Sequence, residues 1–175
     1  MSKSASSSAA LPIAHALLRF LVVMNWIVGV LITVLLFGMP VSEWIRKAIG
    51  IAPGPEADRI IVGLVSIAAL GLVTIPLNYI GLKRLIAIVD TVRLGDPFVA
   101  ANAQRLEVIA RVLLALQIIG MIIGAIGKAI STPAHPIDID AGFSVNGWLA
   151  VLLTFLLARV FAEGTLMRED LEGTI

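Results

Sequence analysis

The sequence contains no cysteine, only two histidines and few charged residues. Lys, Arg, Asp and Glu make up 14% of its 175 residues. The absence of cysteine excludes disulfides, thiolate metal ligands and thiol catalysis. The net charge of +1 predicts no basic surface for nucleic acid, so direct nucleic-acid binding is not expected. What remains is a chain that is 59% hydrophobic, far more apolar than an average soluble domain.

Four long windows of the chain contain no charged residue. A helix that spans a bilayer needs about 20 mostly apolar residues, with a range of roughly 17–25. The first two windows meet this length directly, and the third does so if Arg111 and Lys128 extend their charges to opposite interfaces. The sequence therefore predicts an all-α integral membrane bundle of four transmembrane helices in a lipid bilayer. The windows are Phe20–Ser42, Ile60–Leu82, Val112–Gly127 and Ala141–Ala158.

The second helix should be too long to fit inside the bilayer. If it runs from Asp58 to Leu94 it measures about 55 Å, whereas the hydrocarbon core is only about 30 Å thick. The Gly95-Asp96-Pro97-Phe98 run predicts a tight turn, after which a return helix starts near Ala100. We therefore expect a helical hairpin between the second and third helices that projects out of the membrane.

These boundaries give the predicted organisation of the chain. The expected spans of the first, third and fourth helices are Leu17–Gly38, Val108–Ile130 and Asn146–Ala162. The whole second helix, including its projecting part, is expected over Asp58–Leu94. We expect a disordered arm over residues 1–14, a four-helix transmembrane domain over 15–165 and a charged tail over 166–175.

Two connecting segments have features that deserve an interpretation. Val41–Ile49 is amphipathic, and it could lie in the headgroup region or pack on the end of the bundle. The later loop holds His135, Asp138 and Asp140, which resemble metal ligands. Three such residues in one loop lack a fourth ligand and a scaffold, so we interpret them as a solvated loop and expect no metal.

The distribution of Lys and Arg predicts the orientation. Nine of the 13 cationic residues fall on the side of the hairpin and the two termini, and four fall on the opposite side. Cytoplasmic loops of membrane proteins carry the excess of positive charge. The hairpin and both termini are therefore expected in the cytosol.

Polar residues inside the spans allow two interpretations. Each helix has a stripe of small or polar residues, which is typical of close helix packing and interhelical hydrogen bonds in membranes. The alternative is a ligand or ion site around Asn25, Asn78 and Gln117. Arg159 lies inside the last predicted span, where a charged side chain needs a partner. We expect it near the inner interface as an anchor, within reach of Glu163 or Glu107, rather than as part of a charge relay.

Two stretches of the sequence resemble a known family. They are Gly95-Asp96-Pro97-Phe98-Val99 with Asn102, Arg105 and Leu106, and Val160-Phe161-Ala162-Glu163-Gly164 with Leu166 and Arg168-Glu169-Asp170-Leu171-Glu172-Gly173-Thr174. In these stretches, and from about residue 15 onward, the chain is similar to the bacterial membrane-protein family catalogued as domain of unknown function 2975. The resemblance implies a four-span protein of the bacterial inner membrane that often accompanies a small helix-turn-helix regulator. It implies no catalytic residue.

No Ser/His/Asp set, phosphate-binding glycine loop or pair of active-site carboxylates is present, so we expect neither an enzyme nor a bound cofactor. The hypothesis for function is a regulatory or interaction protein whose cytosolic hairpin binds a soluble partner. The alternative is an accessory subunit of a larger membrane complex, or a small transporter with a site inside the bundle. The oligomeric state stays open. The proposed partner surface consists of Lys83, Asp90, Arg93, Asn102 and Arg105, which could also be solvated or lie against anionic lipid.

Overall fold

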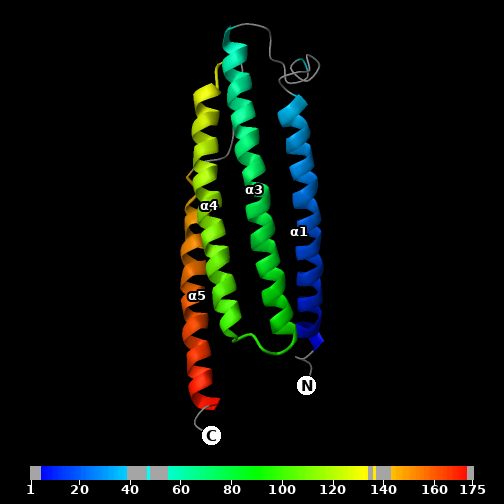
Figure 1. The fold of residues 1–175 in the computed structure, drawn as a ribbon, viewed down its shortest axis with the longest axis vertical. Coiled ribbons are helices and arrows are strands. Elements are labelled where there is room, and N and C mark those ends of the chain that lie inside the picture. Colours follow the sequence, from blue (N-terminus) through cyan, green and yellow to red (C-terminus); the bar gives the residue numbers. More distant parts are fainter. Residues whose placement is uncertain (1–4, 39–46, 48–54, 134–135, 137–142, 173–175) are drawn as a thin grey trace. The chain divides into compact units, whose positions relative to one another are not determined.

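The computed structural model describes residues 5–38, 47, 55–133, 136 and 143–172. Within these residues it contains four long helices and no strand (Figure 1). The helices are α1 (Ala5–Gly38), α3 (Pro55–Arg93), α4 (Ala100–Ile130) and α5 (Val145–Glu172). The predicted amphipathic segment Val41–Ile49 lies outside the described residues except for Lys47.

All four helices are long and apolar enough to cross a membrane. At about 1.5 Å per residue, even the 28-residue α5 measures about 42 Å, more than the roughly 30 Å of a hydrocarbon core. The prediction of an all-α protein with four such helices is confirmed. The predicted turn and return helix are also confirmed, since α3 ends at Arg93 and α4 begins at Ala100.

Two helices extend further than the sequence suggested. α1 begins at Ala5, so the prediction of a disordered arm through residue 14 is wrong for residues 5–14. α5 continues to Glu172, ten residues beyond the expected end of the last span at Ala162. Once a helix is nucleated, each further residue adds one hydrogen bond, so a stable apolar span can extend into its flanks. The flank of α5 contains the good helix formers Leu166, Met167 and Arg168, whereas α1 contains Pro12 within its first turns.

Most of the apolar surface of these helices is exposed. On α1, the side chains of Phe20, Trp26 and Phe37 are each more than half exposed, and on α5 Leu152 and Leu156 are similarly exposed. Monomeric soluble proteins rarely expose contiguous apolar patches of this extent, whereas a bilayer solvates them. Exposure of this kind along helices of spanning length is typical of lipid-facing surface.

The contacts divide the expected transmembrane domain over 15–165 into two compact units. The first takes in Asn78–Ala115 with the described parts of Met1–Met24 and Val145–Ile175, and the second takes in Asn25–Leu77 with Leu116–Ser144. Each helix is much longer than it is wide, so residues near one end of a helix share neighbours with other helices rather than with its own far end. The units therefore combine segments that are distant in the sequence.

In the second unit, glycines allow helices to pack closely. Gly29 of α1 lies against Ile75 of α3, and a Cβ at Gly29 would be 3.2 Å from Ile75 Cγ2. Gly63 of α3 is even closer to α4, because a Cβ there would be 2.4 Å from Ile130 Cγ2. The Arg59 guanidinium also donates a hydrogen bond to the Ala129 carbonyl at the end of α4, at 2.6 Å. A cation is favourable at a helix C-terminus, where carbonyls lack partners.

The hydroxyl groups in the predicted polar stripes bond to their own helices. Thr33 donates to the Gly29 carbonyl at 2.7 Å, Ser66 to Val62 at 2.8 Å and Thr154 to Ala150 at 2.7 Å. These bonds join residues four positions apart, which is a common way for Ser and Thr to be satisfied inside a helix. These three hydroxyls therefore do not make the expected interhelical hydrogen bonds.

Candidate functional site

The turn between α3 and α4 has the geometry of a Schellman motif. The Asp96 amide donates to the Thr91 carbonyl and the Gly95 amide donates to the Val92 carbonyl, both at 3.1 Å. Gly95 has a φ of 84°, a left-handed conformation that glycine adopts without a steric penalty. Pro97 follows directly and cannot continue a helix. The sequence thus fixes both the end of α3 and the reversal of the chain.

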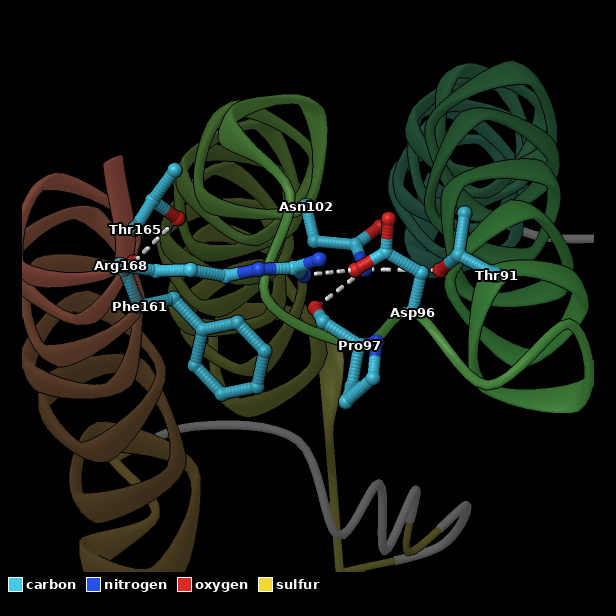
Figure 2. A network of polar contacts seen from close by, with 7 residues as sticks. All are labelled: Thr91, Asp96, Pro97, Asn102, Phe161, Thr165 and Arg168. Atoms are coloured by element: carbon cyan, nitrogen blue, oxygen red, sulfur yellow. Dashed lines mark hydrogen bonds and ion pairs between the residues drawn. The ribbon is translucent and has the colours of Figure 1, made fainter. Parts of the chain in front are cut away.

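Asn102 occupies the inside of this turn. Its side chain is fully buried, at 0% exposure. The side-chain nitrogen of Asn102 (Nδ2) donates to the Thr91 hydroxyl at 2.7 Å and to the Pro97 carbonyl at 2.8 Å (Figure 2). Its side-chain oxygen accepts a hydrogen bond from the Arg105 guanidinium at 2.7 Å. A buried amide is tolerated when its donors and acceptor are satisfied, and here all three polar positions have a partner.

Arg105 extends the same network to α3. Besides Asn102, its terminal nitrogen donates to the Ala87 carbonyl at 3.2 Å. This bond links the first turns of α4 to the last turns of α3. Charge-assisted hydrogen bonds are stronger than neutral ones, and the Arg105 side chain is only partly exposed. Arg105 therefore fastens the two arms of the hairpin to each other.

Two residues of α5 contact the turn between α3 and α4. The Arg168 guanidinium forms an ion pair with the Asp96 carboxylate. The rings of Phe98 and Phe161 pack with their centroids 5.2 Å apart, a separation typical of favourable aromatic pairs. Gly164 leaves room for this contact, because a Cβ there would be 3.4 Å from the Phe98 ring. The C-terminal helix is thus joined to the hairpin by one ionic and one aromatic contact.

We call this assembly the hairpin clasp, and Figure 2 shows the part of it around Asp96 and Asn102. It consists of Thr91, Gly95, Asp96, Pro97, Phe98, Asn102, Arg105, Phe161, Gly164 and Arg168. Nearly all of these residues belong to the two stretches that carry the family resemblance. The sequence reasoning did not recognise that the two stretches pack together. Helical periodicity within either stretch does not indicate this contact.

The clasp changes the interpretation of the predicted partner surface. Lys83 and Arg93 are exposed, and the carboxylate of Asp90 is 4.0 Å from the Arg93 guanidinium. The assignment of Asn102 to an outer face is wrong, because that side chain is fully buried. Arg105 is likewise bound within the hairpin. A polar residue on an amphipathic helix is normally expected to face water, and here hydrogen bonding to the turn overrides that tendency.

The exposed part of the hairpin also contacts α1. The imidazole Nε2 of His15 lies 3.4 Å from a carboxylate oxygen of Asp90. The His15 side chain is 14% exposed and that of Asp90 is 49% exposed. His15 thus places the first turns of α1 beside the last turns of α3, within the same unit as the clasp.

Of the predicted intramembrane polar residues, Asn25 has a described contact with another helix. The Asn25 amide of α1 donates to the Ile75 carbonyl of α3 at 3.1 Å. Asn78 and Gln117 are partly exposed, and no described hydrogen bond connects them with Asn25 or with each other. The described hydrogen bond of Asn25 thus joins two helices, and a ligand or ion site around the three residues stays a prediction.

Arg159 contacts one of its two predicted partners. Its Nε lies 3.0 Å from a carboxylate oxygen of Glu163, one turn later on α5. The other candidate, Glu107, pairs instead with Arg111 on α4 at 2.7 Å. Arg159 and Glu107 both line a cleft of about 370 Å³ between α4 and α5. The predicted pairing with Glu163 is confirmed.

His135, Asp138 and Asp140, the three residues that resemble metal ligands, lie outside the described residues. Within the described residues, no group of three or more His, Asp or Glu side chains is arranged to hold a metal ion.

The four apolar helices define the class of the protein as a multi-pass, all-helical membrane protein. Its family follows from a direct match. A family model described as a protein of unknown function (DUF2975) matches residues 52–175, so the chain belongs to that family. The match includes the hairpin clasp and begins at residue 52 rather than near residue 15, so α1 lies outside it. No curated protein and no solved structure matches the chain.

Proposed function

We propose that this chain is a non-catalytic regulatory or interaction protein of a bacterial inner membrane, and that the hairpin between α3 and α4 lies in the cytosol and binds a soluble partner there. The observation that carries the proposal is Leu94. Its side chain is 84% exposed, although the turn that presents it is fixed by backbone hydrogen bonds. An exposed apolar side chain on a rigid turn needs little ordering on binding, which favours affinity.

The residues around Leu94 supply the chemistry for recognition. Arg93 precedes it with a side chain that is 44% exposed, and Phe98 is 45% exposed. Aromatic residues and arginine are enriched among the residues that contribute most to protein interfaces. A partner surface with an apolar pocket beside a carboxylate would complement Leu94 and Arg93. A small cytosolic regulator is the class of partner that the family resemblance implies.

Site-specific photocrosslinking in cells tests this proposal. A photoreactive amino acid at position 94 should form a discrete adduct with a soluble protein. The control position is Leu153 on α5, which is 54% exposed but lies within an uncharged, lipid-facing window. Arg93→Glu should abolish the adduct at position 94 because it reverses the charge offered to the partner. The same adducts at both positions, or an adduct insensitive to Arg93→Glu, would contradict the proposal.

The alternative of an accessory subunit of a larger membrane complex, or of a small transporter with a site inside the bundle, has weaker support. Its best candidate residue, Asn25, already uses its amide to bond the backbone of Ile75. The space beside Gly29 is filled by the side chain of Ile75, and the space beside Gly63 by that of Ile130. The described contacts of Asn25, Gly29 and Gly63 therefore favour close packing of helices over a ligand site at these positions.

A further inference from the structure

The cleft between α4 and α5 arises from small side chains on two facing helices. Three of its lining residues are alanines, at 103 on α4 and at 158 and 162 on α5. Alanine leaves space where a larger residue would fill the contact between the helices. The cleft volume of about 370 Å³ is within the range of roughly 300–1,000 Å³ that is typical of small-molecule sites. The remaining lining residues are Gln104, Glu107, Phe155 and Arg159.

The cleft contains one group of each charge. Arg159 comes from α5 and Glu107 from α4, and among the described residues each is paired with a residue of its own helix. The side chains of Arg159 and Glu163 are 77% and 58% exposed, and those of Arg111 and Glu107 are 62% and 52% exposed. Exposed pairs of this kind contribute roughly 0–1 kcal/mol, so a ligand can readily compete for either charge.

The position of the cleft in the sequence places it at the edge of the hydrocarbon region. Arg159 directly follows the uncharged window Ala141–Ala158, and Glu107 precedes the window that starts at Val112. Phe155 lies one turn deeper on α5, beside the exposed side chains of Leu152 and Leu156. A ligand in the cleft would have its polar end at headgroup depth and an apolar surface directly below it.

We propose that this cleft binds a zwitterionic aminophospholipid, phosphatidylethanolamine. Arg159 contacts the lipid phosphate, Glu107 accepts hydrogen bonds from the ammonium group, and an acyl chain lies along Phe155. Guanidinium is well suited to phosphate, because it offers several donors in one plane. An anionic lipid would bring a negative charge to Glu107 without an ammonium group to offset it, and Arg111 on the same helix would be the one described cation paired with Glu107. A choline lipid has no N–H to donate to Glu107. The site is independent of the partner surface at Leu94.

Native mass spectrometry of the full chain in detergent tests the site. Phosphatidylethanolamine, phosphatidylglycerol and phosphatidylcholine with identical acyl chains are titrated separately. We expect one phosphatidylethanolamine to bind at least tenfold more tightly than either other lipid. Arg159→Gln should weaken its binding at least tenfold. Glu107→Gln should remove the preference over phosphatidylglycerol, because the repulsion of the anionic lipid disappears.

Two matched controls define what would overturn the proposal. Arg84→Gln removes an exposed arginine just beyond the uncharged window of α3 and should leave lipid selectivity unchanged. Ala162→Leu fills the cleft while keeping both charges and should abolish the selective binding. Equal affinity for the three lipids, or selectivity that survives both Arg159→Gln and Ala162→Leu, would refute the site. Soluble phosphoethanolamine that binds as tightly as the lipid would also refute a lipid as the occupant.

Discussion

Arg168 on α5 is paired with Asp96 in the turn between α3 and α4, although 72 residues separate them in the sequence. Asp96 contacts both elements. Its backbone amide donates the hydrogen bond that closes the Schellman motif, and its carboxylate accepts a hydrogen bond from the Arg168 guanidinium on α5. The end of α3, the turn and the C-terminal helix are thereby connected at a single residue.

Charge reversal tests this ion pair. Asp96→Arg or Arg168→Asp should each lower stability by up to about 1 kcal/mol, because both side chains are nearly half exposed and a like-charged pair replaces the attraction. The double variant should recover most of the loss, since it restores opposite charges. Thermal unfolding in detergent, together with protease cleavage of the end of α5, measures both effects. Glu107→Gln is the control, because it breaks a pair within one helix and should leave α5 attached.

Asn102→Ala should be more damaging than loss of the ion pair. The change removes the side-chain NH2 group that donates hydrogen bonds to the Pro97 carbonyl and the Thr91 hydroxyl. It also removes the side-chain oxygen that accepts a hydrogen bond from Arg105. Leaving buried polar groups unsatisfied costs about 1–3 kcal/mol in the free energy of unfolding. Gln104→Ala, two residues away on an exposed part of α4, should change unfolding by less than about 0.5 kcal/mol. Equal effects in the two variants would show that the clasp does not depend on Asn102.

The sequence was sufficient to predict the hairpin because its signals are local. Gly95 and Pro97 act on the backbone within a few residues, and they stop α3 where the hydrogen bonds show it to end. The number of spanning helices followed from the length of the uncharged windows. The contact between Arg159 and Glu163 was also predictable, since residues four apart on a helix are neighbours.

The hairpin clasp was not predictable in the same way. Asn102 and Arg105 were assigned to an outer face because polar residues on an amphipathic helix usually face water. Their partners Thr91 and Ala87 lie 11 and 18 residues earlier, on the other arm of the hairpin. Helical periodicity describes one helix at a time, so it carries no information about which polar group faces the neighbouring helix.

Fusions to paired reporters test the predicted orientation. A reporter that is active only outside the cytosol should be silent at Pro97 and at the C-terminus, and active near Gly54. A reporter that is active only in the cytosol should give the reverse pattern. The reason is the excess of Lys and Arg on the side of the hairpin, nine against four. Activity of the first reporter at Pro97 would invert the topology and remove the basis for a cytosolic partner.

Gly63→Ala tests the close contact between α3 and α4 in the second unit. The new methyl group would lie 2.4 Å from Ile130 Cγ2 and 2.8 Å from Cδ1. Ile130 is buried, at 5% exposure, and it is branched at Cβ, so its side chain has few rotamers with which to move aside. Overpacking of this kind costs about 1–3 kcal/mol, and unfolding in detergent should show a loss of that size.

The matched control is Gly120→Ala, because nothing lies within 4 Å of a Cβ at that position. Alanine is a better helix former than glycine, so this variant should be as stable as the parent or more stable by up to about 1 kcal/mol. Combining Gly63→Ala with Ile130→Ala removes the clashing atoms, and the double variant should lose less stability than the sum of the two single changes. Additive losses, or a Gly63→Ala variant as stable as Gly120→Ala, would show that α3 and α4 are not in contact at this point.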